Sequence, residues 1–347
     1  MPEITPKFKA AAVHSAPIYM DKAKTLKKVI NWIEKASTES IELLVFPEVF
    51  VPGFPYFINP YPPKQQVGAI IEYGKQSVVV GEDGGDLKEV MAACRKNKLA
   101  ISLGISERMA GGHTLFNAQV MIDSNGQILG VHRKLQPTFA ERYVWAQGSG
   151  HTLRAYETQA GYRIGGLACW EHTLNGARQA LIQDRQQIHA AAWPALSTIE
   201  GFQNVADIQI EAMMKNHAIT AQVFVICASN YVDQSCLDWL TENVGPLKEG
   251  SLGLGGGYSA IYHPFCAAVA GPKVGDGEEL VIADIDLAQI GFVKVWVDGA
   301  GHYSRPEILK FEMDRRPVWP DDVITARSNL RSAPHGDTSQ AGSEGYN

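Results

Sequence analysis

The sequence predicts an α/β protein in which helices cover the faces of β-sheets. Short apolar runs rich in β-branched residues recur along the chain, and several are separated by segments with an apolar period of 3.6 residues. This alternation of strands and helices is typical of layered α/β folds. The 347-residue chain has no interior linker rich in Pro, Gly and Ser. We therefore expect a single domain over residues 1–314 rather than two domains.

Nine apolar runs and four helical segments make up this alternation. Apolar residues recur at i, i+3, i+4 and i+7 from Leu26 and again from Leu87, so each segment is expected to form an amphipathic helix. Asp86 and Glu89 form a capping pattern at the start of the second helix. Two more helices are expected, one from about residue 175 and one over residues 204–221. The expected strands cover residues 10–13, 43–46, 101–105, 118–122, 164–168, 188–192, 223–228, 258–262 and 280–285.

The end of the chain differs from the rest. From about Arg315 onward, both the apolar period and the apolar content are lost. Such a segment cannot bury enough apolar surface to offset the entropy of ordering. We therefore expect residues 315–347 to form a mobile C-terminal tail.

Composition excludes several classes of protein. The chain has 31 Lys and Arg against 37 Asp and Glu, a net charge of −6, and its basic residues are scattered, so no nucleic-acid partner is expected. No apolar run approaches the roughly 18 residues of a membrane span, and the N-terminus lacks the apolar segment of a signal peptide. Five cysteines without a C-x-x-C pair indicate a reducing compartment. A cytoplasmic protein without membrane contact is expected.

Cys169 is the cysteine best placed for chemistry. It ends an apolar strand and precedes a helix, the position at which α/β folds bind ligands and expose backbone N–H groups to an anion. Position alone leaves two interpretations open, a nucleophile or a merely buried thiol. Cys94 and Cys227 lie in apolar patterns typical of core packing, and Cys236 and Cys266 are expected in loops without a role.

A nucleophilic thiol needs a base to accept its proton and a donor to stabilise the developing anion. Glu48 follows an apolar strand, and burial would raise its pKa toward a useful range. Lys134 and Glu141 lie in a second segment, although a lysine there is most often a surface charge. The ten histidines include no metal-binding pair, and Gly253 to Gly257 lack the context of a phosphate loop. No metal or cofactor is expected.

Three motifs together resemble the Glu, Lys and Cys signature blocks of the nitrilase, or carbon–nitrogen hydrolase, superfamily. Their order and spacing also fit that superfamily, and the Cys-Trp-Glu run resembles its nitrilase branch. A fourth segment, residues 298–306, is similar to a block near the C-terminus of true nitrilases. The three motifs are Phe46-Pro-Glu48, His132-Arg-Lys134-Leu-Gln-Pro-Thr-Phe-Ala-Glu141-Arg142 and Ala168-Cys169-Trp-Glu-His172.

The resemblance implies a four-layer α-β-β-α sandwich and a set of catalytic residues. Glu48 is implied as the general base, Lys134 as the cation beside the tetrahedral intermediate, and Cys169 as the nucleophile. Glu141 is implied as a supporting second carboxylate. His172 is assigned no catalytic role, because other residues are expected at this position in relatives.

The implied reaction is hydrolysis of an organic nitrile to the carboxylic acid and ammonia through a cysteine thioimidate and an acyl-enzyme. Alternatives are an amidase that uses the same four residues, a cyanide-hydrolysing relative, or a binding module that leaves the thiol unused. Aromatic and hydroxyl residues next to the motifs are candidates to line the substrate pocket. They are Phe54, Thr138, Trp145, Trp170 and Trp193.

The resemblance also implies self-association. Relatives pair through helices near the active cysteine, so a homodimer is expected, with a larger spiral homo-oligomer as the alternative. The helices expected from residue 175 and over residues 204–221 carry apolar positions suited to such a contact. They are Ala177, Ala180, Leu181, Ile208 and Ile219.

Overall fold

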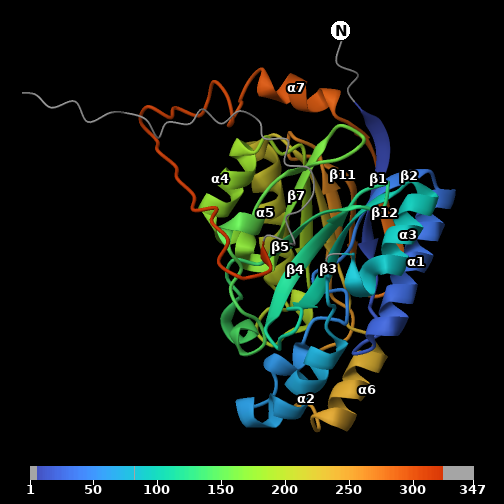
Figure 1. The fold of residues 1–347 in the computed structure, drawn as a ribbon. Helices are drawn as coiled ribbons and strands as arrows, with labels where there is room; N and C mark the ends of the chain where they lie inside the picture. The colour runs from blue at the N-terminus through green and yellow to red at the C-terminus, as the bar shows by residue number, and fades with distance from the viewer. Residues whose placement is uncertain (1–5, 82, 323–347) are drawn as a thin grey trace, which may run out of the picture.

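The protein folds into two β-sheets stacked face to face, with helices on both outer faces. The computed structural model describes residues 6–81 and 83–322. Figure 1 shows α1 and α3 along one outer face and α4 and α5 along the other, with both sheets between them. The four-layer α-β-β-α arrangement predicted for the chain is confirmed.

Each sheet contains six strands and is organised in a similar way. Three central strands run parallel in each sheet, β1, β2 and β3 in the first and β7, β8 and β9 in the second, while antiparallel strands complete both sheets. In spatial order, the first sheet contains β12 (Glu279–Asp286), β1 (Lys7–His14), β2 (Ile41–Val45), β3 (Ala100–Arg108), β4 (Leu115–Ile122) and β5 (Ile128–Arg133). The second contains β11 (Ala268–Val274), β10 (Tyr258–Tyr262), β9 (Phe224–Ser229), β8 (Ile188–Trp193), β7 (Arg163–Ala168) and β6 (Tyr156–Glu157).

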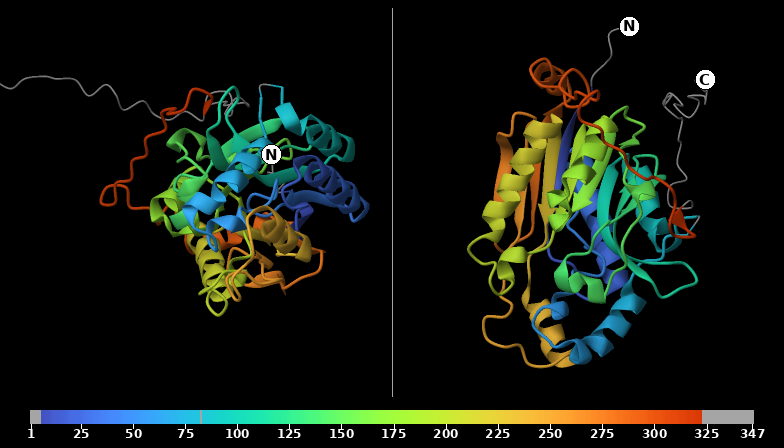
Figure 2. Two further views of the ribbon diagram at one scale, coloured as in Figure 1. Left: turned by 90° about the horizontal axis from the view of Figure 1, so that it is seen from below. Right: turned by 90° about the vertical axis from the view of Figure 1, so that its left-hand side faces the viewer.

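The helices occupy three regions of the molecule. Helices α1 (Lys22–Thr38) and α3 (Lys88–Asn97) cover the first sheet, and α4 (Asn175–Gln183) and α5 (Ala206–Ala221) cover the second (Figure 1). Helices α2 (Pro63–Gln76) and α6 (Gln234–Asn243) lie together at one end, as both views in Figure 2 show. Helix α7 (Ala288–Lys294) lies at the opposite end.

The central strands are mostly apolar because both of their faces are covered. In β1, Ala10 and Ala12 face the second sheet, whereas Ala11 and Val13 pack toward the helices. This alternation follows from the two-residue period of a strand, and a strand covered on both sides has no polar face. Each of the nine apolar runs overlaps a strand of the structure, so the nine expected strands are confirmed.

The structure adds elements that the sequence pattern did not indicate, namely α2, α6, α7, β5, β6 and β11. Strand β11 contains Gly271 and Pro272, which normally argue against a strand. It lies at the edge of the second sheet, where a missing backbone donor is tolerated. Helix α6 corrects a second expectation, because Cys236 is buried within this helix rather than lying in a loop.

The expected cap of α3 is wrong. The helix is preceded by Leu87, and no side chain caps its start. The Asp86 carboxylate instead accepts a hydrogen bond from the Val79 N–H at 2.9 Å and pairs with Lys22 Nζ at 2.8 Å. Asp86 therefore joins α1 to the segment before α3.

The packed chain extends past the expected boundary at residue 314. Arg315 pairs with Asp184 at 2.8 Å, and the Trp319 ring packs edge-on against Phe116 with 5.0 Å between ring centroids. The carboxylate of Asp321 lies 2.8 Å from the Arg133 guanidinium. The remainder of the expected tail, residues 323–347, lies outside the described residues.

Within the described part of the chain, no helix is both long enough and apolar enough to cross a membrane.

Candidate active site

Glu48 lies immediately beyond β2 and is completely buried. Its loop passes close to β3 because Gly104 has no side chain: a Cβ there would lie 2.1 Å from the Pro47 carbonyl oxygen. Glu48 Oε1 accepts hydrogen bonds from Asn117 Nδ2 at 2.6 Å and Lys134 Nζ at 2.9 Å. Glu48 Oε2 is buried and has no partner among the described residues. One carboxylate oxygen is thus held in place, and the other remains available to a proton donor.

Lys134 follows β5 and carries a buried ammonium between two carboxylates. Its Nζ lies 2.9 Å from Glu48 Oε1 and 2.8 Å from Glu141 Oε2. Burial disfavours a charged lysine, but the two carboxylates outweigh this and raise the Lys134 pKa well above its usual value. The alternative of a surface lysine is therefore wrong.

Glu141 is fixed by the turn that carries it, the 3₁₀ helix Phe139–Tyr143. Thr138 and Glu141 form a capping box, in which Glu141 Oε2 accepts from the Thr138 N–H at 2.8 Å. The same oxygen accepts from Lys134. The T-x-x-E spacing of Thr138 and Glu141 is the signal in the sequence that could have indicated this box.

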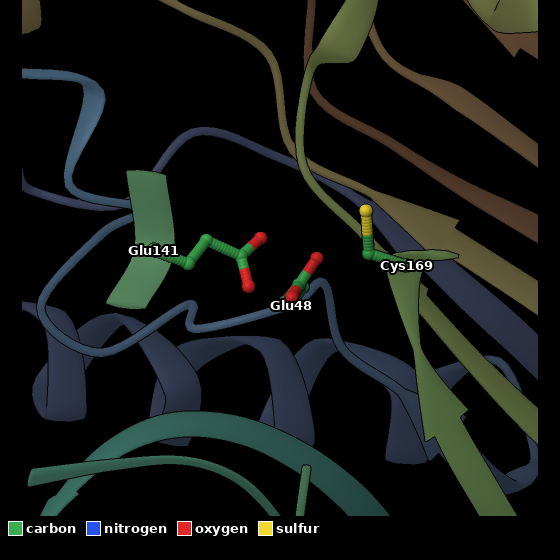
Figure 3. A group of neighbouring side chains, drawn as sticks. All are labelled: Glu48, Glu141 and Cys169. Carbon is green, nitrogen blue, oxygen red and sulfur yellow. The ribbon is translucent and has the colours of Figure 1, made fainter. Parts of the chain in front are cut away.

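Cys169 directly follows β7 and has a left-handed backbone, with φ of +52°. Such a conformation costs about 1–3 kcal/mol in a residue other than glycine and persists only where the surroundings hold it. Figure 3 shows the Cys169 thiol beside the carboxylates of Glu48 and Glu141. Sγ and one carboxylate oxygen from each glutamate lie within 4.8 Å of one another. The structure therefore brings together the four residues implied as catalytic.

The electrostatics of this group keep the proton on the thiol at rest and give Glu48 a pKa suited to a general base. Burial raises the pKa of Cys169, as does the charge of Glu48, so the resting thiol keeps its proton. Burial also raises the pKa of Glu48, to about 7, while Lys134 opposes that rise. A carboxylate with a pKa near neutrality is suited to act as a general base.

A pocket of about 360 Å³ opens above the thiol. Its walls come from the loop before α2, the Glu141 turn, the residues after Cys169 and the segment before α5. Most of its lining is apolar. The lining residues are Phe54, Ile58, Asn59, Thr138, Phe139, Ala140, Glu141, Cys169, Trp170, Leu196, Ile199 and Phe202.

This buried group of Glu, Lys and Cys coincides with a family match. A family model described as carbon-nitrogen hydrolase matches residues 9–295, which includes all four residues. The chain belongs to the carbon–nitrogen hydrolase family. It is accordingly a hydrolase of carbon–nitrogen bonds, and its resemblance to nitrilases is confirmed by its relatives.

Similar proteins include an aliphatic nitrilase from Rhodococcus rhodochrous, which is 35% identical over 94% of this chain and 85% of its own length. A nitrilase from Pseudomonas syringae pv. syringae is 33% identical over 92% of this chain and 95% of its own length. Among solved structures, a carbon–nitrogen hydrolase from Helicobacter pylori G27 has a TM-score of 0.67 with 19% identity, covering 88% of this chain and 98% of its own. That structural similarity supports the fold.

The five residues expected to line the pocket divide into two groups. Phe54, Thr138 and Trp170 are among the lining residues, whereas Trp145 and Trp193 are not. Trp145 is buried behind Phe54 and donates its indole N–H to Ser106 Oγ at 3.0 Å. Trp193 is completely buried and stacks on the His172 ring, with centroids 5.2 Å apart. Both tryptophans support the pocket from behind.

Glu171 has a structural role that sequence reasoning missed. Its buried carboxylate accepts hydrogen bonds from the N–H groups of Leu135 at 2.8 Å and Ala168 at 3.0 Å, and lies 3.1 Å from His132 Nε2. Burial disfavours its charge, but His132 and these N–H groups together lower the Glu171 pKa. Glu171 therefore ties the segment that carries Lys134 to the segment that carries Cys169.

Glu48, Glu141 and Cys169 also have the spacing of a metal-binding group. However, the Lys134 ammonium contacts both carboxylates and supplies the positive charge at their centre. A cation at this position would be repelled by Lys134, so we interpret the group as a proton-transfer site.

Proposed function

We propose that this enzyme is a nitrilase, which hydrolyses an organic nitrile to the carboxylic acid and ammonia. The observation that carries the proposal is the buried group in which Glu48, Lys134 and Glu141 converge on Cys169, in a chain whose relatives include nitrilases over most of its length. The reaction consumes two water molecules for each nitrile and uses no redox chemistry.

The first half of the reaction forms a covalent thioimidate. Glu48 Oε2 accepts the Cys169 proton as sulfur attacks the nitrile carbon, and the nitrile nitrogen takes up a proton to complete the thioimidate. Water then adds to the same carbon and gives a tetrahedral species. Lys134 and the backbone N–H of Trp170 stabilise the negative charge that develops there, a type of contact worth about 3 kcal/mol per donor.

The second half releases both products. The carbon–nitrogen bond breaks as nitrogen is protonated, and ammonia departs. The acyl group then remains bound to Cys169 as a thioester. A second water, which Glu48 can deprotonate, attacks the thioester carbon. The carbon–sulfur bond breaks, the acid departs, and Cys169 recovers its proton. Glu141 holds Lys134 in place throughout.

The pocket supports a nitrile larger than hydrogen cyanide. Its volume of about 360 Å³ greatly exceeds a nitrile group, and Phe54, Leu196 and Phe202 offer apolar surface to an organic substituent. An amide would bring an additional N–H and C=O into this pocket. Leaving such groups without partners costs about 1–3 kcal/mol each. The lining therefore favours nitriles over amides.

The first prediction separates the nitrilase from an amidase. In a panel of matched nitriles and amides, we expect ammonia release mainly from the nitriles, with the acid as the main product. Each amide should be at least about tenfold poorer in kcat/KM, the effect of one unpaired polar group. The measurement is the initial rate of ammonia release. Amides that react faster than every matched nitrile would establish the amidase alternative. Activity confined to cyanide would establish the alternative of a cyanide-hydrolysing enzyme.

We also propose that the enzyme forms at least a C2 homodimer through α4 and α5. The exposed surface differs from the one expected, because Ala177, Ala180 and Leu181 are buried inside the subunit. Ile208 is 68% exposed and Val205 is 41% exposed at the start of α5, which leaves apolar surface for a partner.

The second prediction tests this assembly. Light scattering at micromolar concentration should give at least twice the subunit mass, and Ile208→Asp should shift the protein toward the monomer because a charge would be buried. Lys215→Ala, on the same helix, is a control that leaves the apolar surface intact. A fully active monomeric wild-type protein would contradict the proposal.

A further inference from the structure

Three buried histidines lie in a row behind Cys169 and take no part in the proton transfers described above. They are His172 in the turn after β7, His189 in β8 and His217 in α5. Gln186, which precedes β8, is buried among them. The His189 and His217 rings lie 4.0 Å apart, and the His172 and His189 rings 5.1 Å apart. Histidines are seldom fully buried, so a row of three calls for a physical explanation.

A continuous set of contacts links this row to the nucleophile. His172 Nδ1 lies 2.6 Å from the carbonyl oxygen of Cys169, and His172 Nε2 lies 2.9 Å from His189 Nε2. His189 Nδ1 lies 3.1 Å from Gln186 Nε2. His217 Nε2 lies 3.3 Å from Gln186 Oε1. His217 Nδ1 has no hydrogen-bond partner among the described residues, so His217 is the end of this set of contacts that lies farthest from Cys169.

The three rings are neutral. Burial lowers the pKa of His172 to about 4 and lowers the pKa of His189 and His217 well below the usual value. The Cys169 carbonyl and Glu171 favour a charge on His172, but they do not outweigh its burial. A neutral imidazole has one N–H donor and one acceptor nitrogen.

The direction of every hydrogen bond then follows from the first. A carbonyl oxygen only accepts, so His172 Nδ1 must donate to Cys169, and His172 Nε2 must accept. His189 Nε2 therefore donates to it, and His189 Nδ1 accepts from Gln186 Nε2. Gln186 Oε1 accepts from His217 Nε2. A glutamine is suited to this position because its amide both donates and accepts. Gly165 leaves room for it, since a Cβ there would lie 2.9 Å from Gln186 Nε2.

The hydrogen bond from His172 Nδ1 to the Cys169 carbonyl oxygen acts on the peptide unit between Cys169 and Trp170. In a trans peptide, the C=O and N–H point in opposite directions. A donor that holds the Cys169 carbonyl oxygen from behind therefore directs the Trp170 N–H toward the reaction side. Burial raises the pKa of the Cys169 thiol, and the Trp170 N–H acts in the opposite direction by favouring the thiolate. The left-handed backbone of Cys169 also needs such support, because its conformation is intrinsically unfavourable.

We propose that His172 is a positioning residue, held by Gln186, His189 and His217 in one fixed tautomer, which orients the Cys169–Trp170 peptide so that its N–H faces the tetrahedral intermediate. This role rests on the proposed function for its catalytic consequence, but the tautomers do not depend on the substrate. Trp193 keeps the His172 ring in plane by stacking at an interplanar angle of 13°. His172 touches no reacting atom, so its effect is exerted through Trp170.

A pair of His172 variants tests the positioning role. The side-chain amide introduced by His172→Asn can place an N–H where His172 Nδ1 lies, as Asn97 and Asn243 do toward carbonyls one turn earlier. We therefore expect His172→Asn to retain kcat within about threefold. His172→Leu has no donor, and a misdirected oxyanion donor should lower kcat at least about tenfold with little change in KM. Equal kcat values for the two variants would overturn the proposal.

His14→Leu is a matched control for loss of a buried histidine. His14 is completely buried and contacts Ser259 Oγ at 2.9 Å and the Gly275 carbonyl oxygen at 2.8 Å, but it has no bond to Cys169. It should lower the urea midpoint of unfolding about as much as His172→Leu while leaving kcat close to wild type. If kcat instead falls equally in His14→Leu, the loss reflects stability, and the positioning role is wrong.

A spectroscopic measurement needs no substrate and separates this inference from the proposed function. In protein labelled with ¹⁵N at histidine, ring-nitrogen chemical shifts identify which nitrogen carries the proton. We expect His172 protonated at Nδ1 and both His189 and His217 protonated at Nε2, with each resonance assigned by its loss in a His→Gln variant. A charged His172, or His189 protonated at Nδ1, would overturn the inference whatever substrate the enzyme hydrolyses.

Discussion

The Cys169→Ala variant should lose at least about a thousandfold in kcat while remaining folded. Removal of a nucleophile leaves no atom to form the thioimidate, and residual catalysis by binding and charge alone is far smaller. The change removes a single sulfur atom from a pocket wall, so the midpoint of urea unfolding should stay near wild type. Steady-state ammonia release and equilibrium unfolding measure the two effects separately.

Cys94→Ala is the matched control. Cys94 is completely buried where α3 packs on the first sheet, so loss of its sulfur should cost roughly 1 kcal/mol of stability and leave kcat unchanged. If Cys169→Ala retained more than about a thousandth of wild-type kcat, covalent catalysis at Cys169 would be excluded.

The fold was predictable where strands are buried on both faces. Apart from His189, the runs that became β1, β2, β8 and β9 consist of apolar residues, which distinguishes them from their surroundings. Strand β11 was not predictable, because an exposed edge strand can contain Gly271 and Pro272. Helices α2 and α6 lie together at one end, where Tyr61 and Gln65 donate hydrogen bonds to the carbonyls that follow α6, and such contacts between distant segments determine their formation.

The site was predictable as residues but not as a pocket. Glu48, Lys134 and Cys169 each follow a strand, and the strand ends converge because the two sheets are stacked. The pocket walls are different: Ile58, Leu196 and Phe202 lie in irregular segments far from the motifs. Their direction depends on turns whose conformation no periodic pattern encodes. Trp193 illustrates the same limit. Successive residues of β8 face opposite sides of the sheet, so an apolar run does not indicate which side the Trp193 ring faces.

Glu48→Gln should be nearly inactive, with a loss in kcat comparable to that of Cys169→Ala. The substitution preserves shape: the amide oxygen can still accept from Asn117 and Lys134, as Oε1 does. The amide nitrogen then replaces Oε2 and cannot accept the thiol proton. Stability should change little, and a well-folded Glu48→Gln variant with wild-type kcat would exclude Glu48 as the base.

The pH dependence of the wild-type enzyme follows from the same residue. Glu48 must be ionised to accept a proton, and burial places its pKa at about 7. We therefore expect kcat/KM to be constant above that pH and to fall about tenfold per pH unit below it.

Glu141 contributes to the position of this acid limb, because its negative charge raises the Glu48 pKa. Glu141→Gln removes that repulsion and should shift the acid limb to lower pH, while the loss of a partner for Lys134 lowers kcat. A limb that moves upward, or stays in place, would show that a group other than Glu48 controls the ionisation. The direction of the shift thus identifies the base even in a variant whose activity is reduced for other reasons.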